Sequence, residues 1–163
     1  MRLATLLLAL LLAGCASSPE TPAGGQAPAW QFTALDGSTH AQEAPEANAT
    51  VLFFMATWCG SCRSKAPMLA EAQDELAGQG VRFLSVDFDP TESADAIEAW
   101  QARYGHDWPH GIDAGLSVQR ALGVRTQSSV VVLAADGAIV EHFGYGQVSA
   151  AGLREAVSRA LAQ

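Results

Sequence analysis

Two cysteines three residues apart, Cys59 and Cys62, follow almost directly on a continuous apolar run. The run, residues 51–55, has the length and composition of a strand that is buried on both faces of a sheet. Apolar residues then recur at helical spacing over residues 66–76, and two glycines follow as a stop signal. The sequence therefore predicts a buried strand followed by a helix whose first turn carries both thiols.

This spacing gives the two thiols a specific chemistry. One helical turn places their Cα atoms about 5 Å apart, which a disulfide tolerates without backbone rearrangement. Unpaired N–H groups and the helix dipole favour negative charge at the N-terminal sulfur, so we expect a lowered pKa for Cys59. Cys59 would then attack a partner disulfide, and Cys62 would resolve the mixed disulfide. Trp58 offers a flat apolar surface beside the sulfur for an incoming chain.

A zinc site is the main alternative use of two cysteines, but it needs about four ligands. The histidines are scattered, with His40 near a predicted hairpin and His142 in a predicted strand. His106 and His110 do not share a helix face because Pro109 lies between them. We therefore expect each histidine to be a solvated surface residue, and neither a metal nor another cofactor to be bound.

The N-terminus has the features of an export signal. We expect residues 1–14 to be a signal peptide, because they have a short positive start and an apolar segment too short to span a bilayer. The end of this segment and Cys15 resemble the lipobox of bacterial lipoproteins, in which the cysteine is lipidated and becomes the new N-terminus. An ordinary secretory signal is the alternative. We expect residues 15–29 to be a flexible lipidated tether and residues 30–163 to be the domain, held outside the cytoplasm on a bacterial membrane, in the periplasm or at the cell surface. An oxidising compartment also argues against two idle thiols.

The composition fits one globular domain. The chain has 163 residues, which is too short for two domains. It is 49% hydrophobic and 16% charged, which is enough apolar material for one core. Nine basic residues against 17 acidic ones give a formal charge of -8. No basic cluster interrupts this balance, so a nucleic-acid-binding surface is excluded.

The remaining elements follow a β-α-β order that implies parallel strands with crossover helices. Trp30, Trp100 and Trp108 are expected to pack in the core or at an edge. The expected elements are an N-terminal hairpin around the turn at Asp36-Gly37, a strand at 81–87, a helix at 93–104, a short helix at 116–122, a hairpin from 130–133 to 139–143, and a last helix capped by Ser149.

The motif and its surroundings resemble thioredoxin-fold oxidoreductases of the extracytoplasmic TlpA/ResA-type branch. The resemblance rests on Trp58 before Cys-Gly-Ser-Cys, Pro67 after it, the segments 81–90 and 103–109, and residues 122–125 with the apolar strand that follows. It implies an α/β thioredoxin-like fold: a central mixed sheet flanked by helices, with an inserted helix and strand and an N-terminal hairpin. It also implies a thiol-disulfide oxidoreductase with Cys59 as nucleophile and Cys62 as resolving thiol. Members of this branch often act as reductases in cytochrome c maturation.

Three positions depart from the family pattern. The family usually has a cis-proline facing the disulfide, where this chain has Ser128, so we expect a trans Gln127-Ser128 peptide and an altered substrate-contacting loop. Phe53 stands where thioredoxins often carry a buried Asp, and Lys65 where many relatives carry a Glu. Lys65 either lowers the pKa of the Cys59 thiol or simply extends into water.

Three functions remain open at this point. The first is an anchored oxidoreductase that exchanges disulfides with exported proteins and with a membrane or periplasmic redox partner, acting as a monomer. The second is a copper-binding protein that uses the two thiolates and a nearby histidine. The third is a non-catalytic lipoprotein whose exchange loop has lost its function.

Overall fold

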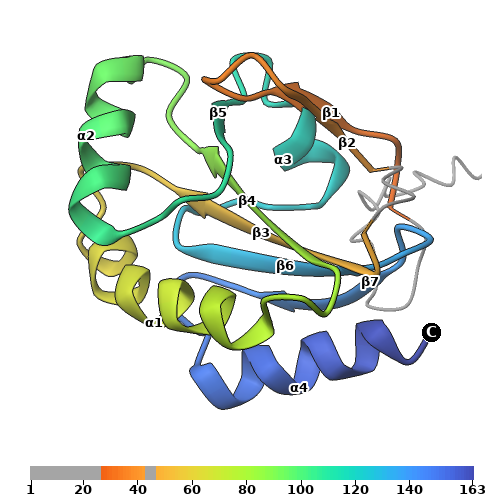
Figure 1. Ribbon diagram of the computed structural model, residues 1–163. Coiled ribbons are helices and arrows are strands. Elements are labelled where there is room, and N and C mark those ends of the chain that lie inside the picture. The colour runs from red at the N-terminus through yellow and green to blue at the C-terminus, as the bar shows by residue number, and fades with distance from the viewer. Residues whose placement is uncertain (1–26, 43–46) are drawn as a thin grey trace, which may run out of the picture.

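The computed structural model describes residues 27–42 and 47–163 and has a five-stranded mixed sheet at its centre (Figure 1). The predicted signal peptide, the lipidation site at Cys15 and most of the tether lie outside the described residues. The elements are β1 (Gln31–Thr33), β2 (Thr39–Ala41), β3 (Ala49–Met55), α1 (Gly60–Leu76), β4 (Val81–Asp87), α2 (Ala94–Tyr104), β5 (His110–Ile112), α3 (Ser117–Ala121), β6 (Ser129–Ala134), β7 (Ile139–Phe143) and α4 (Ala150–Leu161).

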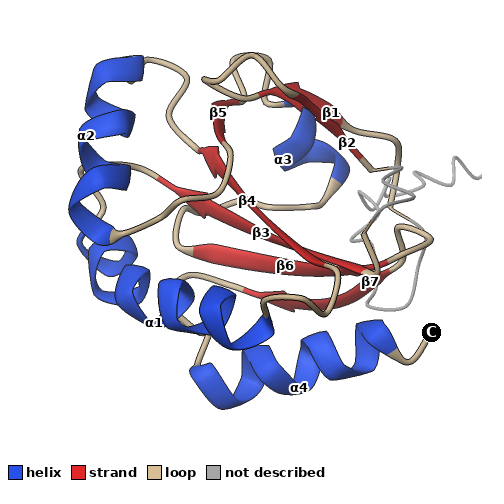
Figure 2. Cartoon of the chain, viewed as in Figure 1, coloured by secondary structure: helices blue, strands red, loops and turns tan. Residues whose placement is uncertain are grey.

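The central strand β3 is buried along its whole length because both sheet faces are covered. The strand order is β5-β4-β3-β6-β7, with β3 parallel to β4 and antiparallel to β6. Helices α1 and α4 cover one face, and α3 and the β1-β2 hairpin cover the other (Figure 2). Alternate residues of β3 accordingly enter two different cores: Phe53 packs on the side of α1 and α4, and Phe54 on the side of α3. This arrangement confirms the predicted thioredoxin-like α/β fold.

The N-terminal hairpin forms a two-stranded sheet of its own. It is joined to the central sheet through a bridge between Ala34 and Gly111 in β5. Packing begins before Trp30, where the sequence placed the start of the domain, since Ala27 is buried and accepts a hydrogen bond from the Gln42 side chain at 2.8 Å. The end of the predicted tether therefore contacts the domain.

The prediction of solvated histidines is wrong for His106 and His110, which are only 4% and 2% exposed. Both lie among the rings of Trp100 and Trp108, and the His106 ring stacks on Trp108 with a centroid distance of 3.9 Å. Burial lowers the pKa of His106 to about 4 and that of His110 to about 3. Both imidazoles are therefore neutral core groups, packed with the tryptophans that were correctly predicted to be buried.

Candidate active site

Cys59 and Cys62 form a disulfide at the start of α1, with their Cα atoms 5.2 Å apart. Cys59 is the N-cap residue, and its sulfur accepts a hydrogen bond from the Cys62 backbone N–H at 3.1 Å. Cys62 is fully buried, while Cys59 retains a 2% exposed fraction. Of the two residues only Cys59 keeps any exposed area, so Cys59 is the one that a partner sulfur would approach. A negative charge on the Cys59 sulfur would sit at the positive end of the helix and accept an N–H directly.

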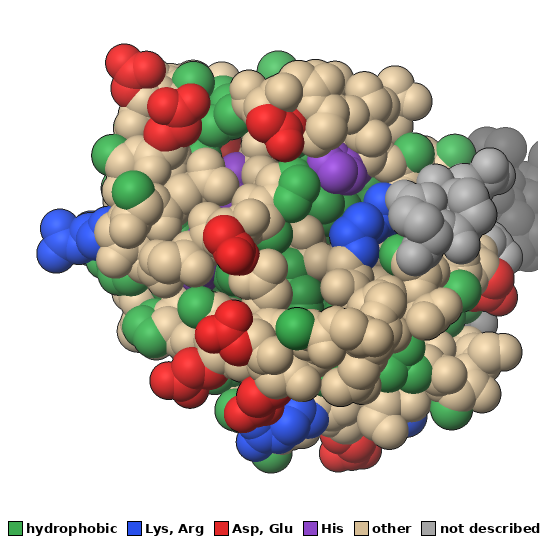
Figure 3. Space-filling model, in the orientation of Figure 1, with side chains coloured by type: hydrophobic (Ala, Val, Ile, Leu, Met, Phe, Trp, Pro, Cys, Tyr) green, Lys and Arg blue, Asp and Glu red, His purple; other side chains and the backbone are tan. Residues whose placement is uncertain are grey.

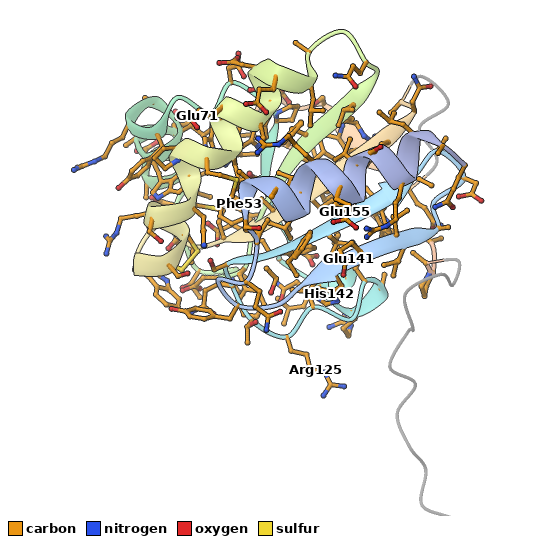
Figure 4. The ribbon with its side chains drawn as sticks, turned by 90° about the horizontal axis from the view of Figure 1, so that it is seen from below. Phe53, Glu71, Arg125, Glu141, His142 and Glu155 are labelled. Carbon is orange, nitrogen blue, oxygen red and sulfur yellow. A yellow bond between two sulfur atoms is a disulfide. The ribbon has the colours of Figure 1, made fainter. Side chains whose placement is uncertain are left out.

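The strand before the motif, β3, packs against the start of α1 through Phe53. Phe53, labelled in Figure 4, lies on the helical side of the sheet, where it packs in the same core cluster as both cysteines. Its ring also contacts Trp100 and His106, at centroid distances of 6.4 and 6.3 Å. The position where thioredoxins often carry a buried carboxyl group is thus filled here by an aromatic ring.

Trp58 lies on the surface beside the motif, with 55% of its area exposed. Its indole N–H donates to the Asp89 carboxylate at 3.1 Å, which fixes the ring without burying it. The ring is therefore positioned to offer the flat apolar surface that the sequence predicted.

Ser128 lies against the motif, at the position where the family resemblance implies a cis-proline. Its hydroxyl and that of Ser61 are 2.9 Å apart, and Ser128 is completely buried. The described chain contains no cis peptide bond, and Ser128 adopts a left-handed conformation with φ of 59°. Gln127 is half-buried beside it. Ser128 therefore contacts the motif through its hydroxyl and without a cis peptide bond, which differs from the family pattern.

Two cations lie on the first turns of α1. Lys65 is half-buried and forms no hydrogen bond or ion pair with any described residue, so its effect on the thiol stays a prediction. Arg63, which the sequence analysis did not single out, folds back toward the motif. Its Nη2 atom lies 3.9 Å from the point that a Cβ on Gly60 would occupy. A guanidinium group is therefore adjacent to the dipeptide between the two cysteines.

Two acidic residues after β4, Asp89 and Glu92, hold the segment that precedes Cys59, and the carboxylate of Asp87 at the end of β4 accepts the Asp89 N–H. The Glu92 carboxylate accepts hydrogen bonds from the Thr57 backbone N–H at 3.0 Å and from its hydroxyl at 2.8 Å. Asp89 holds Trp58, as described above. Asp87 is 1% exposed, and burial, reinforced by the neighbouring charge of Glu92, raises its pKa to about 8. Glu92 was not singled out from the sequence.

No metal centre is present among the residues that the structure describes, where no three His, Cys, Asp or Glu side chains converge in a suitable group. The histidine nearest the first helix, His106, uses its Nε2 atom in a 2.9 Å hydrogen bond with the carbonyl oxygen of Ala66. Within residues 27–42 and 47–163, no helix has the length and apolar character needed to cross a bilayer.

The chain is similar to known proteins both in sequence and in fold. Residues 22–155 match the Redoxin family model. The chain is 27% identical over 118 residues to the thiol-disulfide oxidoreductase ResA of Bacillus thuringiensis, covering 72% of this chain and 67% of that protein. It is 31% identical over 131 residues to the mercury resistance operon ORF3 protein of Streptomyces lividans, covering 76% and 68%. Among solved structures, a thioredoxin-family thiol:disulfide interchange protein of Chlorobium tepidum superposes with a TM-score of 0.70 at 22% identity, covering 83% of this chain and 95% of the other.

Proposed function

The chain belongs to the Redoxin family and is a thiol-disulfide oxidoreductase of the ResA kind, and we propose that it exchanges disulfides with exported proteins through Cys59 and Cys62. The observation that carries this proposal is the position of the disulfide. It closes over one helical turn, with the slightly exposed Cys59 capping the helix and Cys62 buried behind it.

The reaction runs in two exchange steps when the chain acts as a reductant. The Cys59 thiolate attacks one sulfur of the partner disulfide, the partner S–S bond breaks, and the released partner sulfur takes up a proton. Cys62 then loses its proton and attacks the Cys59 sulfur of the mixed disulfide, which releases the second partner sulfur as a thiol. Two electrons pass from the chain to the partner, and the two protons that the partner sulfurs take up balance the one released when the Cys59 thiolate forms and the one released by Cys62. The Cys59–Cys62 bond observed here is the oxidised product. The reverse sequence oxidises a partner dithiol.

The location and partners belong to the same proposal. The lipobox-like sequence ending at Cys15 supports an enzyme lipidated on this cysteine and held on the outer side of a bacterial membrane. Its partners would be exported protein thiols or disulfides and a membrane or periplasmic redox protein. Reduction of apocytochrome cysteines is one such task, as the resemblance to the TlpA/ResA-type branch implies.

The test of the exchange chemistry is reduction of insulin disulfides by the full chain in detergent, with dithiothreitol as electron donor. We expect turnover in the wild type, none above background in Cys59→Ser, and a trapped mixed disulfide in Cys62→Ser. Absence of turnover in the wild type would overturn the proposal. In that case stoichiometric Cu(I) binding would indicate a copper-binding protein, and failure to bind copper a non-catalytic domain.

The anchoring is tested separately by metabolic labelling with a fatty acid. We expect label on the wild type and none on Cys15→Ser, with the altered protein released from the membrane fraction. Equal membrane retention of both forms would contradict lipidation at Cys15.

A further inference from the structure

A groove runs beside the redox motif, between the start of α1 and the outer part of α2. Its volume is about 710 Å³. Thr57, Gly60 and Arg63 line it on the side of the motif, and Ala99, Arg103 and Tyr104 line it on the side of α2. One end of the groove is therefore formed by residues on either side of Cys59 in the sequence.

The charge of this groove is opposite to that of the molecule. The chain has a formal charge of -8 and only nine basic residues, two of which, Arg63 and Arg103, line the groove. In Figure 3 carboxylates are spread over the visible face, while basic side chains gather at few places. Among the residues that the structure describes, none of those that line the groove is acidic. Glu92 lies near its end, where its carboxylate already accepts two hydrogen bonds from Thr57.

The two guanidinium groups are free to meet a ligand. Both arginines are exposed, and the ion pairs among the described residues involve Arg154 and Arg159 on α4 instead. The central carbon of the Arg103 guanidinium lies 5.8 Å from the ring centroid of Tyr104. Arg63 folds toward Gly60, as described above. Each cation is thus placed at a wall of the groove, with one of them adjacent to the motif.

The groove surface between the cations suits a polypeptide. Gly60, Ser64, Ala96 and Ala99 have small side chains, which allow a backbone to approach closely, and the Tyr104 ring adds apolar area. Glu98, the acidic residue of α2 nearest in sequence to Ala99, lines a different pocket on the other side of the helix.

We propose that this groove binds an acidic extended segment of the partner protein, next to the partner cysteine that reacts with Cys59. The proposal rests on the exchange function above and adds the class of partner. Electrostatic complementarity of this kind acts mainly on the rate of encounter and on discrimination between partners. The acidic body of the enzyme would repel such a partner elsewhere and leave the groove as the favourable approach.

The test compares two synthetic peptides that share one disulfide and differ only in the flanking segment, which is rich in Asp and Glu in one and in Lys in the other. The second-order rate of their reduction by the reduced full chain is measured at low salt. We expect the acidic peptide to react roughly three- to tenfold faster, from contacts with two exposed charges. The ratio should approach one in 1 M salt, where the Debye length is about 3 Å.

The variant Arg103→Glu assigns the effect to the groove. Because both rates are measured on one preparation, any change in thiol reactivity cancels in their ratio, and we expect the preference for the acidic peptide to vanish or invert. Arg63 is left unchanged because it lies beside the motif. Arg120→Glu, on α3 at the opposite face of the sheet, makes the same change in net charge and should keep the wild-type ratio. Arg103→Lys should also keep it, which guards against a folding defect in the first variant.

The outcomes separate this proposal from the exchange function. If both peptides are reduced equally, or if Arg103→Glu and Arg120→Glu change the ratio alike, the groove proposal is wrong while the exchange chemistry stands. If neither peptide is reduced, the exchange function itself fails.

Discussion

Ser128 shows how a single residue shapes the surroundings of the disulfide. Its N–H donates to the Phe54 carbonyl at 2.7 Å, and its own carbonyl accepts from the Gly146 N–H at 2.9 Å. These contacts hold a left-handed conformation that costs a residue with a side chain about 1–2 kcal/mol. The Ser128 hydroxyl in turn contacts that of Ser61, which lies between the two cysteines.

Two substitutions separate the hydroxyl contact from the backbone strain. Ser128→Ala and Ser128→Gly both lose the contact with Ser61, but only glycine adopts positive φ without a steric cost. We expect Ser128→Ala to lower the free energy of unfolding by about 1–2 kcal/mol, and Ser128→Gly to be more stable than Ser128→Ala by about 1 kcal/mol. Urea denaturation of the oxidised proteins measures both values. An alanine variant as stable as the glycine variant would show that the conformation at Ser128 is not strained.

Gly146 supports the motif from the loop after β7. It has φ of 65°, and a Cβ there would lie 2.8 Å from the Ser61 hydroxyl. Gly78 has φ of 79° with no atom within 4 Å of its Cβ position, so it shares the strain and lacks the contact. We expect both Gly146→Ala and Gly78→Ala to lose about 1 kcal/mol of stability, and only Gly146→Ala to slow insulin reduction severalfold. Equal reduction rates in the two variants would exclude a role for this contact.

At the scale of elements, the sequence predicts best where the pattern is local. The strands at 81–87 and 139–143 have the predicted bounds, because continuous or alternating apolar runs define them. The predicted N-cap Ser149 accepts a hydrogen bond from the Gly152 N–H, and α4 follows it directly. The disulfide pair was predictable for the same reason, since both cysteines lie on one helical turn.

Elements that depend on distant contacts were not predictable. The strand β5 has only three residues, and it forms because Ser85 of β4 pairs with His110 and because Ala34 bridges to Gly111. The burial of His106 was equally hidden, since it requires a hydrogen bond to Ala66, forty residues earlier. Glu92 contacts Thr57 across 35 residues, with no sequence pattern that links the two.

The carboxyl groups of Asp87, at the end of β4, and of Glu92, in the loop that follows, interact electrostatically. The charge of Glu92 contributes to the raised pKa of Asp87, after the larger effect of burial. Glu92→Gln removes this charge and keeps an oxygen for Thr57, so we expect the pKa of Asp87 to fall below about 8 while staying above its ordinary value. Carboxyl-carbon NMR titration of the oxidised protein measures it. The matched control Glu98→Gln, exposed on α2, should leave the Asp87 titration unchanged, and an unchanged titration in Glu92→Gln would refute the coupling.

For the whole molecule, the three buried groups with large pKa shifts dominate the dependence of stability on pH. His106 and His110 have lowered pKa values in the folded state, so below pH 6.5 the unfolded chain binds protons that the folded chain does not. Their contribution to the free energy of unfolding is complete above pH 6.5. It is lost as the pH falls toward the folded pKa values of about 4 for His106 and about 3 for His110. Asp87 has a raised folded pKa, so the folded chain binds the extra proton between pH 3.8 and about 8. Its contribution is therefore lost as the pH rises through this range.

These opposite slopes predict a maximum of stability near pH 6.5 for the oxidised protein, in which the thiols do not titrate. Between about pH 4 and 6.5 the unfolded chain binds about one more proton than the folded chain, so stability rises by about 1.4 kcal/mol per pH unit. Between pH 6.5 and 8 the folded chain binds about one more proton than the unfolded chain, so stability falls with a similar slope.

The substitution Asp87→Asn removes only the contribution of Asp87. We expect its stability to rise more steeply below pH 6.5 and to stay level above it, as measured by urea denaturation across this pH range. If the variant kept the alkaline decline of the wild type, a group other than Asp87 would have to release the proton, and the buried carboxyl group beside the redox motif would be ionised in the folded protein at neutral pH.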